Sequence, residues 1–178
     1  MSGLWLASYV ALWILVILLV IVVLGLVRQL GLIHLRLGLD SHVLTTNEGL
    51  ELNTAAPEFS GTDLTCGREL KLADLKGRPS VLIFASPSCG PCRALLAHLA
   101  TFHRKWRRKV NIVLFSQSDS QIAIDLIHVY RLKLSTLADP DGVVAKTYRV
   151  HATPFAYRLD KNGIVQRRGI VNDLEGLE

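Results

Sequence analysis

The stretch Ser86-Pro87-Ser88-Cys89-Gly90-Pro91-Cys92-Arg93 places two cysteines, two residues apart, between an apolar run and an amphipathic segment. The run, residues 81–85, is continuously apolar and lies between two prolines, which is typical of a strand buried on both faces of a sheet. Downstream, apolar residues at helical spacing predict a helix from about residue 90 to about residue 106: Leu95, Leu99, Phe102 and Trp106. The two thiols are therefore expected where a buried strand turns into a helix.

This position predicts redox chemistry for the pair. The first-turn N–H groups of a helix have no intrahelical partners and carry the positive end of its dipole, so they stabilise a thiolate on Cys89. Cys89 is then the predicted nucleophile. Cys92 follows within the first turn, close enough to attack a mixed disulfide on Cys89 and release the partner. The pair is predicted to be a two-electron thiol–disulfide switch.

Two other uses of the cysteines are weaker. A structural zinc site normally needs four ligands, but Cys66 is the only other cysteine and no histidine is spaced to complete a finger or ribbon. An inert disulfide closing so short a loop would gain little stability. We therefore expect no metal and no cofactor.

Three segments resemble thioredoxin-fold proteins of the membrane-anchored TlpA/ResA type. They are Pro87-Ser88-Cys89-Gly90-Pro91-Cys92, Ala152-Thr153-Pro154-Phe155 and Asp160-Lys161-Asn162-Gly163, and the resemblance covers about residues 49–171. A narrower resemblance, to the methylamine utilisation protein MauD, rests on two further features. These are the apolar N-terminal segment that runs into residues 28–34, and Ser86-Pro87-Ser88 where thioredoxins usually carry an aromatic residue.

The resemblance implies an α/β thioredoxin fold, with a central mixed sheet flanked by helices, and a particular site. Pro154 would follow a cis peptide bond opposite the cysteine pair, with the backbone of Thr153 free to pair with an extended substrate. Gly90 and Pro91 would complete the site between the cysteines. Thioredoxin has a buried acid on the preceding strand, and this chain has Ile83 at the matching position.

The N-terminal segment predicts a membrane anchor. Residues 4–27 contain no charge and are long enough to cross a hydrocarbon core of roughly 30 Å. A basic start and a cleavage site, which mark a signal peptide, are missing. The expected domains are an anchor at 1–28, a connector at 29–49 and a redox domain at 50–178.

The topology signals conflict. Arg28 and Arg36 follow the span, which taken literally places the following domain in the cytoplasm. The resemblance implies a periplasmic domain instead. We follow the resemblance and expect a single-pass inner-membrane protein.

The rest of the redox domain is expected to alternate strands and helices. The predicted elements are a short hairpin within residues 56–72, a buried strand at 110–115, a helix capped by Ser118 or Asp119 through about Leu132, a turn at 137–142, a short helix at 143–149, and a hairpin of strands 156–159 and 164–169 joined through Asn162-Gly163. Residues 172–178 are expected to begin a final helix.

Several charged and polar residues have simple interpretations. Five cations between Arg104 and Lys109 complement a helix C-terminus, although contact with anionic lipid or an acidic partner is an alternative for a chain of net charge +5. No motif indicates nucleic-acid binding. Cys66 is interpreted as a bystander and His98 as a surface residue, while His151 is a candidate to tune the thiols.

The predicted function is a membrane-anchored thiol:disulfide oxidoreductase that acts on a client protein with cysteines or disulfides and exchanges electrons with a redox partner protein. The MauD resemblance implies the small subunit of methylamine dehydrogenase as client. A thiol reductase for cytochrome c maturation is an alternative. A copper chaperone would favour three residues between the cysteines, and a peroxiredoxin-type peroxidase would use Thr-x-x-Cys where this chain has Ser86-Pro87-Ser88-Cys89. The direction of electron flow stays open, since Gly-Pro between the cysteines is the dipeptide of the reducing thioredoxins.

Overall fold

The computed structural model describes residues 3, 5, 9–23 and 49–171. Its contacts divide the chain into two compact units, residues 1–40 and 41–178, which are considered separately. The predicted connector, apart from Gly49, and the predicted final helix at 172–178 lie outside the described residues.

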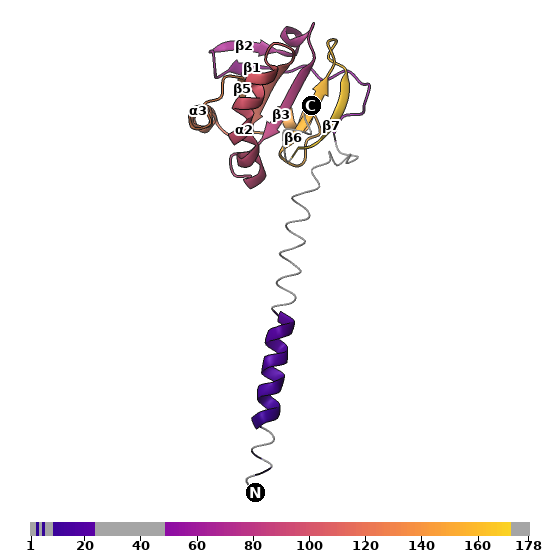
Figure 1. The fold of residues 1–178 in the computed structure, drawn as a ribbon. Coiled ribbons are helices and arrows are strands. Elements are labelled where there is room, and N and C mark those ends of the chain that lie inside the picture. The colour runs from indigo at the N-terminus through magenta and orange to yellow at the C-terminus, as the bar shows by residue number, and fades with distance from the viewer. Residues whose placement is uncertain (1–2, 4, 6–8, 24–48, 172–178) are drawn as a thin grey trace. The chain divides into compact units, whose positions relative to one another are not determined.

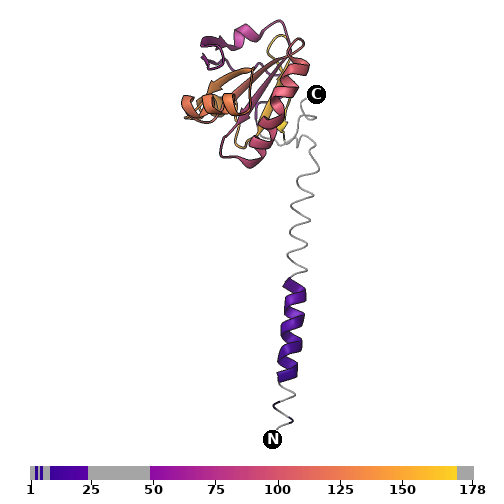
Figure 2. The same ribbon diagram turned by 60° about the vertical axis from the view of Figure 1, so that its left-hand side comes forward.

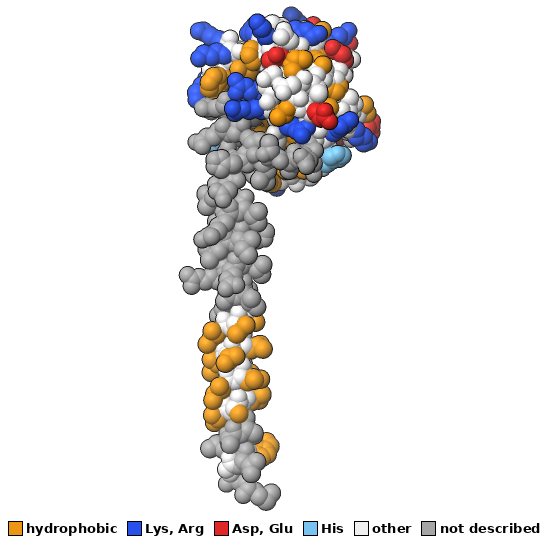
Figure 3. Space-filling model, turned by 90° about the vertical axis from the view of Figure 1, so that its right-hand side faces the viewer, with side chains coloured by type: hydrophobic (Ala, Val, Ile, Leu, Met, Phe, Trp, Pro, Cys, Tyr) orange, Lys and Arg blue, Asp and Glu red, His pale blue; other side chains and the backbone are white. Residues whose placement is uncertain are grey.

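The N-terminal unit is helical over residues 9–23. Its large apolar side chains are exposed, from 43% at Val16 to 65% at Ile21, and hydrophobic side chains line the visible side of this helix in Figure 3. Within the described residues, the structure contains no helix that combines the length and the apolarity needed to cross a membrane.

The second unit is built on a five-stranded mixed sheet in the order β5-β4-β3-β6-β7 (Figure 1). The central strand β3 (Ser80–Ala85) is parallel to β4 (Asn111–Ser116), and β4 is parallel to β5 (Ser135–Ala138). On its other side, β3 is antiparallel to β6 (Phe155–Leu159), which is antiparallel to β7 (Val165–Ile170). All six residues of β3 are buried, as its apolar run predicts.

Helices cover both faces of this sheet. Helix α2 (Gly90–Trp106) and helix α3 (Ser120–Val129) contribute to one core cluster, and the short α4 (Val143–Thr147) contributes to the other (Figure 2). The connections from β3 to β4 and from β4 to β5 step in the same direction, so right-handed crossovers bring α2 and α3 to the same face. The mixed thioredoxin-type sheet flanked by helices is confirmed.

Three boundaries differ from prediction by two residues or more. The predicted turn at 137–142 is wrong at its start, because Leu137 and Ala138 belong to β5, a four-residue strand that is too short to give a clear pattern. Helix α3 ends at Val129 rather than near residue 132, because the chain turns into the left-handed region at Arg131, with φ of 51°. Helix α4 ends at Thr147 for the same reason, since Arg149 has φ of 53°.

The predicted hairpin before the sheet is confirmed. Strands β1 (Ser60–Asp63) and β2 (Arg68–Lys71) pair antiparallel, and the 3-10 helix η1 (Leu72–Leu75) follows. Asp63 is buried, and one carboxylate oxygen accepts hydrogen bonds from the N–H groups of Thr65 at 2.9 Å and Thr136 at 3.2 Å. This carboxylate ties the hairpin to β5.

Two buried tyrosines dock the segment that leads into the domain. The Tyr157 hydroxyl accepts from the N–H of Leu50 at 3.0 Å, and the Tyr148 hydroxyl donates to the Pro57 carbonyl at 2.6 Å. Burial raises the pKa of both tyrosines above the ordinary value of 10.0, so both hydroxyls keep their protons well into the alkaline range.

Candidate active site

Cys89 occupies the N-cap of α2, at the junction with the loop that follows β3. Its backbone is extended, with φ of −81° and ψ of 120°, and Pro91 lies in the first turn, where a missing N–H is harmless. The Cys89 Sγ accepts a hydrogen bond from the N–H of Cys92 at 3.2 Å. The sulfur therefore takes the place of the capping oxygen that usually occupies such a site.

The opposite wall of the site is the segment before β6. The Thr153–Pro154 peptide bond is cis, as the resemblance implies, and the Cys89 Sγ donates to the Thr153 carbonyl at 3.3 Å. Antiparallel pairing of β3 with β6, which aligns Phe84 with Phe155, brings this segment beside the cysteine loop. The structure thus brings Cys89, Thr153 and Pro154 together from distant parts of the sequence.

These two contacts favour different forms of the sulfur. A backbone N–H stabilises a thiolate, whereas a carbonyl oxygen accepts the proton of a thiol. Cys89 is half-buried, and Gly90 and Pro91 beside it are exposed. A Cβ built on Gly90 would meet no atom within 4 Å, so the surface at Gly90, next to Cys89 in the sequence, is open.

Cys92 is fully buried, and no part of its side chain is available to a protein partner. Burial raises its pKa to about 11, and the hydrogen bond with Cys89 adds to this effect. Ile83 belongs to the same core cluster, so the position that carries an acid in thioredoxin contributes only apolar surface here. Cys92 is therefore placed to react with a disulfide formed at Cys89, and a partner protein cannot reach its sulfur directly.

Two pairs of serine hydroxyls lie at the same edge of the sheet, and the sequence did not predict these pairs, although it singled out Ser86, Ser88 and Ser118 for other reasons. Ser86 and Ser88 are 2.9 Å apart through their hydroxyls, and Ser116 and Ser118 are 2.8 Å apart. The Gln117 N–H donates to the Ala85 carbonyl at 2.9 Å and joins the two loops. The available signal is that both pairs lie at the carboxyl ends of neighbouring parallel strands, which meet at one edge.

The remaining candidate residues form none of the hydrogen bonds described for Cys89 and Cys92. His98 is exposed on α2, as predicted, and His151 is exposed before the cis bond and takes no part in the hydrogen bonds described for Cys89 and Cys92. Cys66 is exposed in the β1–β2 turn, with its Sγ 3.4 Å from Asp63 Oδ2. In the described part of the chain, no three metal-ligating side chains gather into a cluster.

The fold and the dithiol at the start of α2 define a thioredoxin-like thiol–disulfide oxidoreductase. The chain belongs to the AhpC/TSA family, whose model matches residues 52–171. It is 29% identical over 181 residues to the methylamine utilization protein MauD of Paracoccus denitrificans, which covers 100% of this chain and 88% of that protein. It is 32% identical over 123 residues to the thiol-disulfide oxidoreductase ResA of Bacillus thuringiensis, covering 68% of this chain and 70% of the relative.

Solved structures share the fold. A putative thiol:disulfide interchange protein DsbE from Chlorobium tepidum superimposes with a TM-score of 0.63 at 22% identity, covering 68% of this chain and 86% of that one. At this identity the likeness concerns the arrangement of the sheet and helices.

Proposed function

We propose that this chain is a membrane-anchored enzyme that exchanges disulfides with an exported client through Cys89 and Cys92. The observation that carries the proposal is the asymmetry of the pair, with one sulfur half-exposed at a helix N-cap and the other fully buried behind it. Such a pair separates capture of a client from its release.

Capture begins with the Cys89 thiolate. It attacks one sulfur of a client disulfide, a bond forms between Cys89 and that sulfur, and the second client sulfur leaves as a thiolate. The N–H of Cys92, 3.2 Å from the Cys89 Sγ, stabilises the attacking charge. The Thr153 segment flanks the same sulfur, and we assign it the role of pairing with the extended client chain.

Release is carried out by Cys92. Its thiolate attacks the Cys89 Sγ, the mixed disulfide breaks, and the remaining client sulfur leaves as a thiolate. The client gains two electrons, and the chain is left with a Cys89–Cys92 disulfide that a redox partner protein must reduce. The same steps run in reverse oxidise a client dithiol, so the potential of the redox partner sets the direction.

The proposed client is the disulfide-bearing small subunit of methylamine dehydrogenase. The support is the extent of the similarity to MauD, which spans 181 residues including the N-terminal segment, whereas the similarity to ResA spans 123 residues. A client of cytochrome c maturation is the competing outcome of the experiment below.

We further propose that residues 4–27 anchor the chain in the inner membrane with the redox domain on the periplasmic side. The support is the uncharged apolar sequence and the exposed apolar side chains along residues 9–23. A helix that is apolar on all sides needs an apolar environment.

Substrate trapping tests the chemistry. In a Cys92→Ala protein the mixed disulfide on Cys89 has no internal attacker, so the client should accumulate as a covalent adduct that is identified by mass spectrometry. The matched control is Cys66→Ala, which leaves the pair intact and should trap nothing. If the adduct persists when Cys89 is also replaced by serine, the proposed order of attack is wrong.

Labelling of Cys66 tests the location. Cys66 is the exposed thiol of the hairpin, so in a Cys89→Ser, Cys92→Ser protein it is the single target for a membrane-impermeant maleimide. Labelling in spheroplasts with an intact inner membrane supports a periplasmic domain. Labelling only after lysis contradicts it.

A further inference from the structure

A cleft of about 550 Å³ lies at the end of α2 away from the cysteines. We call it the cationic cleft, and its polar lining comprises Thr101, His103, Arg104 and Arg107 from α2, and Tyr130, Arg131 and Lys133 from the segment after α3. At 1.5 Å per helical residue, Cys89 and Arg104 are about 22 Å apart along the helix. The cleft is therefore separate from the redox site.

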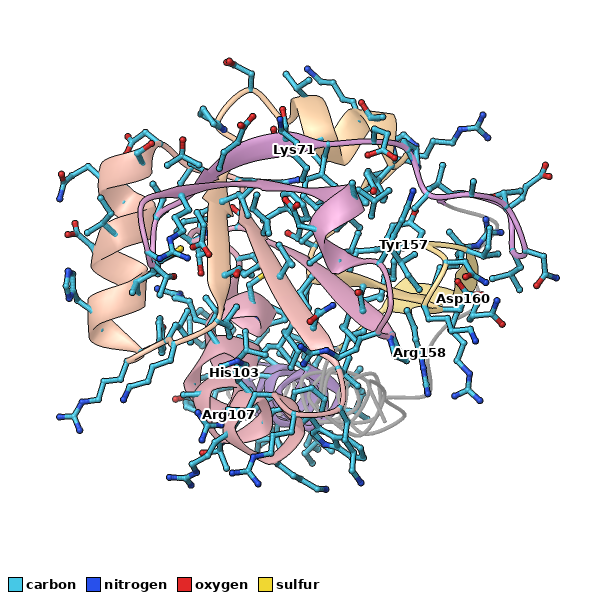
Figure 4. All side chains as sticks on the ribbon, turned by 90° about the horizontal axis from the view of Figure 1, so that it is seen from above. Lys71, His103, Arg107, Tyr157, Arg158 and Asp160 are labelled. Carbon is cyan, nitrogen blue, oxygen red and sulfur yellow. The ribbon has the colours of Figure 1, made fainter. Side chains whose placement is uncertain are left out.

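The cleft exists because two helices end side by side. Helices α2 and α3 both connect parallel strands on the same face of the sheet, so their C-terminal ends meet at the edge opposite the cysteines. Arg104 and Arg107, three residues apart on α2, both line the cleft together with His103. His103 and Arg107 are labelled in Figure 4. The segment of residues 130–133 forms the facing wall.

The positive charge in the cleft is not balanced within it. Its lining contains four cations and no carboxylate, and among the described residues none of the four side chains forms an ion pair or a hydrogen bond. Each helix C-terminus supplies roughly −0.5 charge, so two ends offset about one cation of the four. Complementing the helix dipoles therefore explains only part of this charge.

The histidine in the lining is uncharged. Burial, and then the charge of Arg107, lower the pKa of His103 from its ordinary value of 6.5. His103 is therefore neutral at neutral pH and contributes an imidazole, not a fifth charge, to the cleft.

A second observation concerns the backbone of Arg131. It lies in the left-handed region, with φ of 51°, directly after the C-cap of α3. Glycine is the usual residue at this position because a side chain there is strained. The chain instead carries an arginine, and its side chain lines the cleft.

We propose that the cationic cleft binds the phosphate group of an anionic ligand. Three guanidinium groups offer paired N–H donors that match phosphate oxygens, and the hydroxyls of Thr101 and Tyr130 add two further donors. This chemistry fits a soluble phosphate ester and the headgroup of an anionic phospholipid equally well.

Amide NMR of the full chain in neutral detergent tests the proposal. Glycerol 3-phosphate is titrated at constant ionic strength, and the shifts of residues 100–107 and 130–133 are followed. In a second arm the chain is placed in nanodiscs of phosphatidylcholine with or without phosphatidylglycerol, and this arm alone depends on the proposed anchor. Saturable shifts with the soluble ester identify a soluble ligand, and shifts that need phosphatidylglycerol identify a lipid headgroup. Both results support the site.

The variants separate this site from a general charge effect. Arg107→Gln should weaken binding at least about tenfold, in line with the loss of one charge-assisted contact. Arg108→Gln makes the same charge change at the same helix end but outside the cleft, and should leave binding unchanged. Arg131→Gly should weaken binding while keeping or raising the melting temperature, because glycine relieves the left-handed backbone.

The proposal is overturned if neither arm gives shifts, or if Arg107→Gln and Arg108→Gln weaken binding equally. Disulfide exchange should be unchanged in all three variants, so this test is independent of the redox proposal.

Discussion

The burial of Cys92 predicts that the rate at which a captured client is released rises steeply with pH. We expect this rise to continue to a higher pH than for an ordinary thiol. Attack on the mixed disulfide needs the Cys92 thiolate, and with a pKa of about 11 only about one molecule in ten thousand carries it at pH 7. In the mixed disulfide Cys89 no longer ionises, but burial, the largest cause of the raised pKa, persists.

The magnitude follows from the thiolate fraction. Between pH 9 and 10 a thiol with a pKa of about 11 gains about ninefold in thiolate, whereas a thiol at the ordinary value of 9.0 gains less than twofold. The rate of release should therefore rise about tenfold per pH unit from pH 7 to about pH 10.

The assay uses an aromatic disulfide whose released thiolate absorbs visible light, in a Cys66→Ser background that removes the exposed third thiol. Attack by Cys89 gives a first phase that scales with reagent concentration. Attack by Cys92 gives a second phase that does not, and this phase should be missing in Cys92→Ala. If the rate of the second phase levels off below pH 9, Cys92 ionises more easily in the mixed disulfide than its burial implies. That result would refute the prediction.

Three further predictions concern stability. Because the folded pKa of Cys92 is raised above 9.0, the stability that its neutral thiol contributes is present below pH 9 and is lost as the pH rises to about 11. Across this window the free energy of unfolding of the reduced protein should fall by about 2 kcal/mol more than that of Cys92→Ala, measured by urea titration at each pH. Asp63→Ala should cost about 2 to 4 kcal/mol, measured by urea unfolding, because the N–H groups of Thr65 and Thr136 lose their acceptor; a loss under 0.5 kcal/mol would contradict the role given to this carboxylate. Tyr157→Phe should cost about 1 to 2 kcal/mol and speed hydrogen exchange at Leu50, and unchanged exchange there would show that the hydroxyl does not hold the lead-in segment.

The sequence was sufficient for the elements around the cysteines because their signals are local. The apolar run of β3, the spacing of Leu95 and Leu99, and Pro91 in the first turn each act within a few residues, and the predicted helix agrees with Gly90–Trp106. Asn162-Gly163 likewise marks the β6–β7 turn without reference to the rest of the chain.

The features that were missed depend on tertiary neighbours. Strand β5 is four residues long and is held in place by pairing with β4, a contact that no local pattern encodes. Each serine pair is local, but the two pairs come to the same edge only because β3 and β4 align in parallel. Arg131 and Arg107 line one cleft only because the two crossovers have the same hand. The position of Thr153 beside Cys89 was available only from the resemblance, since 64 residues separate the two.

The complete burial of Cys92 has a consequence for how the protein behaves among competing small thiols. Glutathione-like molecules can reach the half-exposed sulfur of Cys89 and release a client at a rate that rises with their concentration, but they cannot reach Cys92. Release through Cys92 is an internal first-order step whose rate does not depend on the thiol concentration of the compartment. Where small thiols are scarce, the time that a client stays attached is therefore limited by how rarely the buried Cys92 sulfur loses its proton.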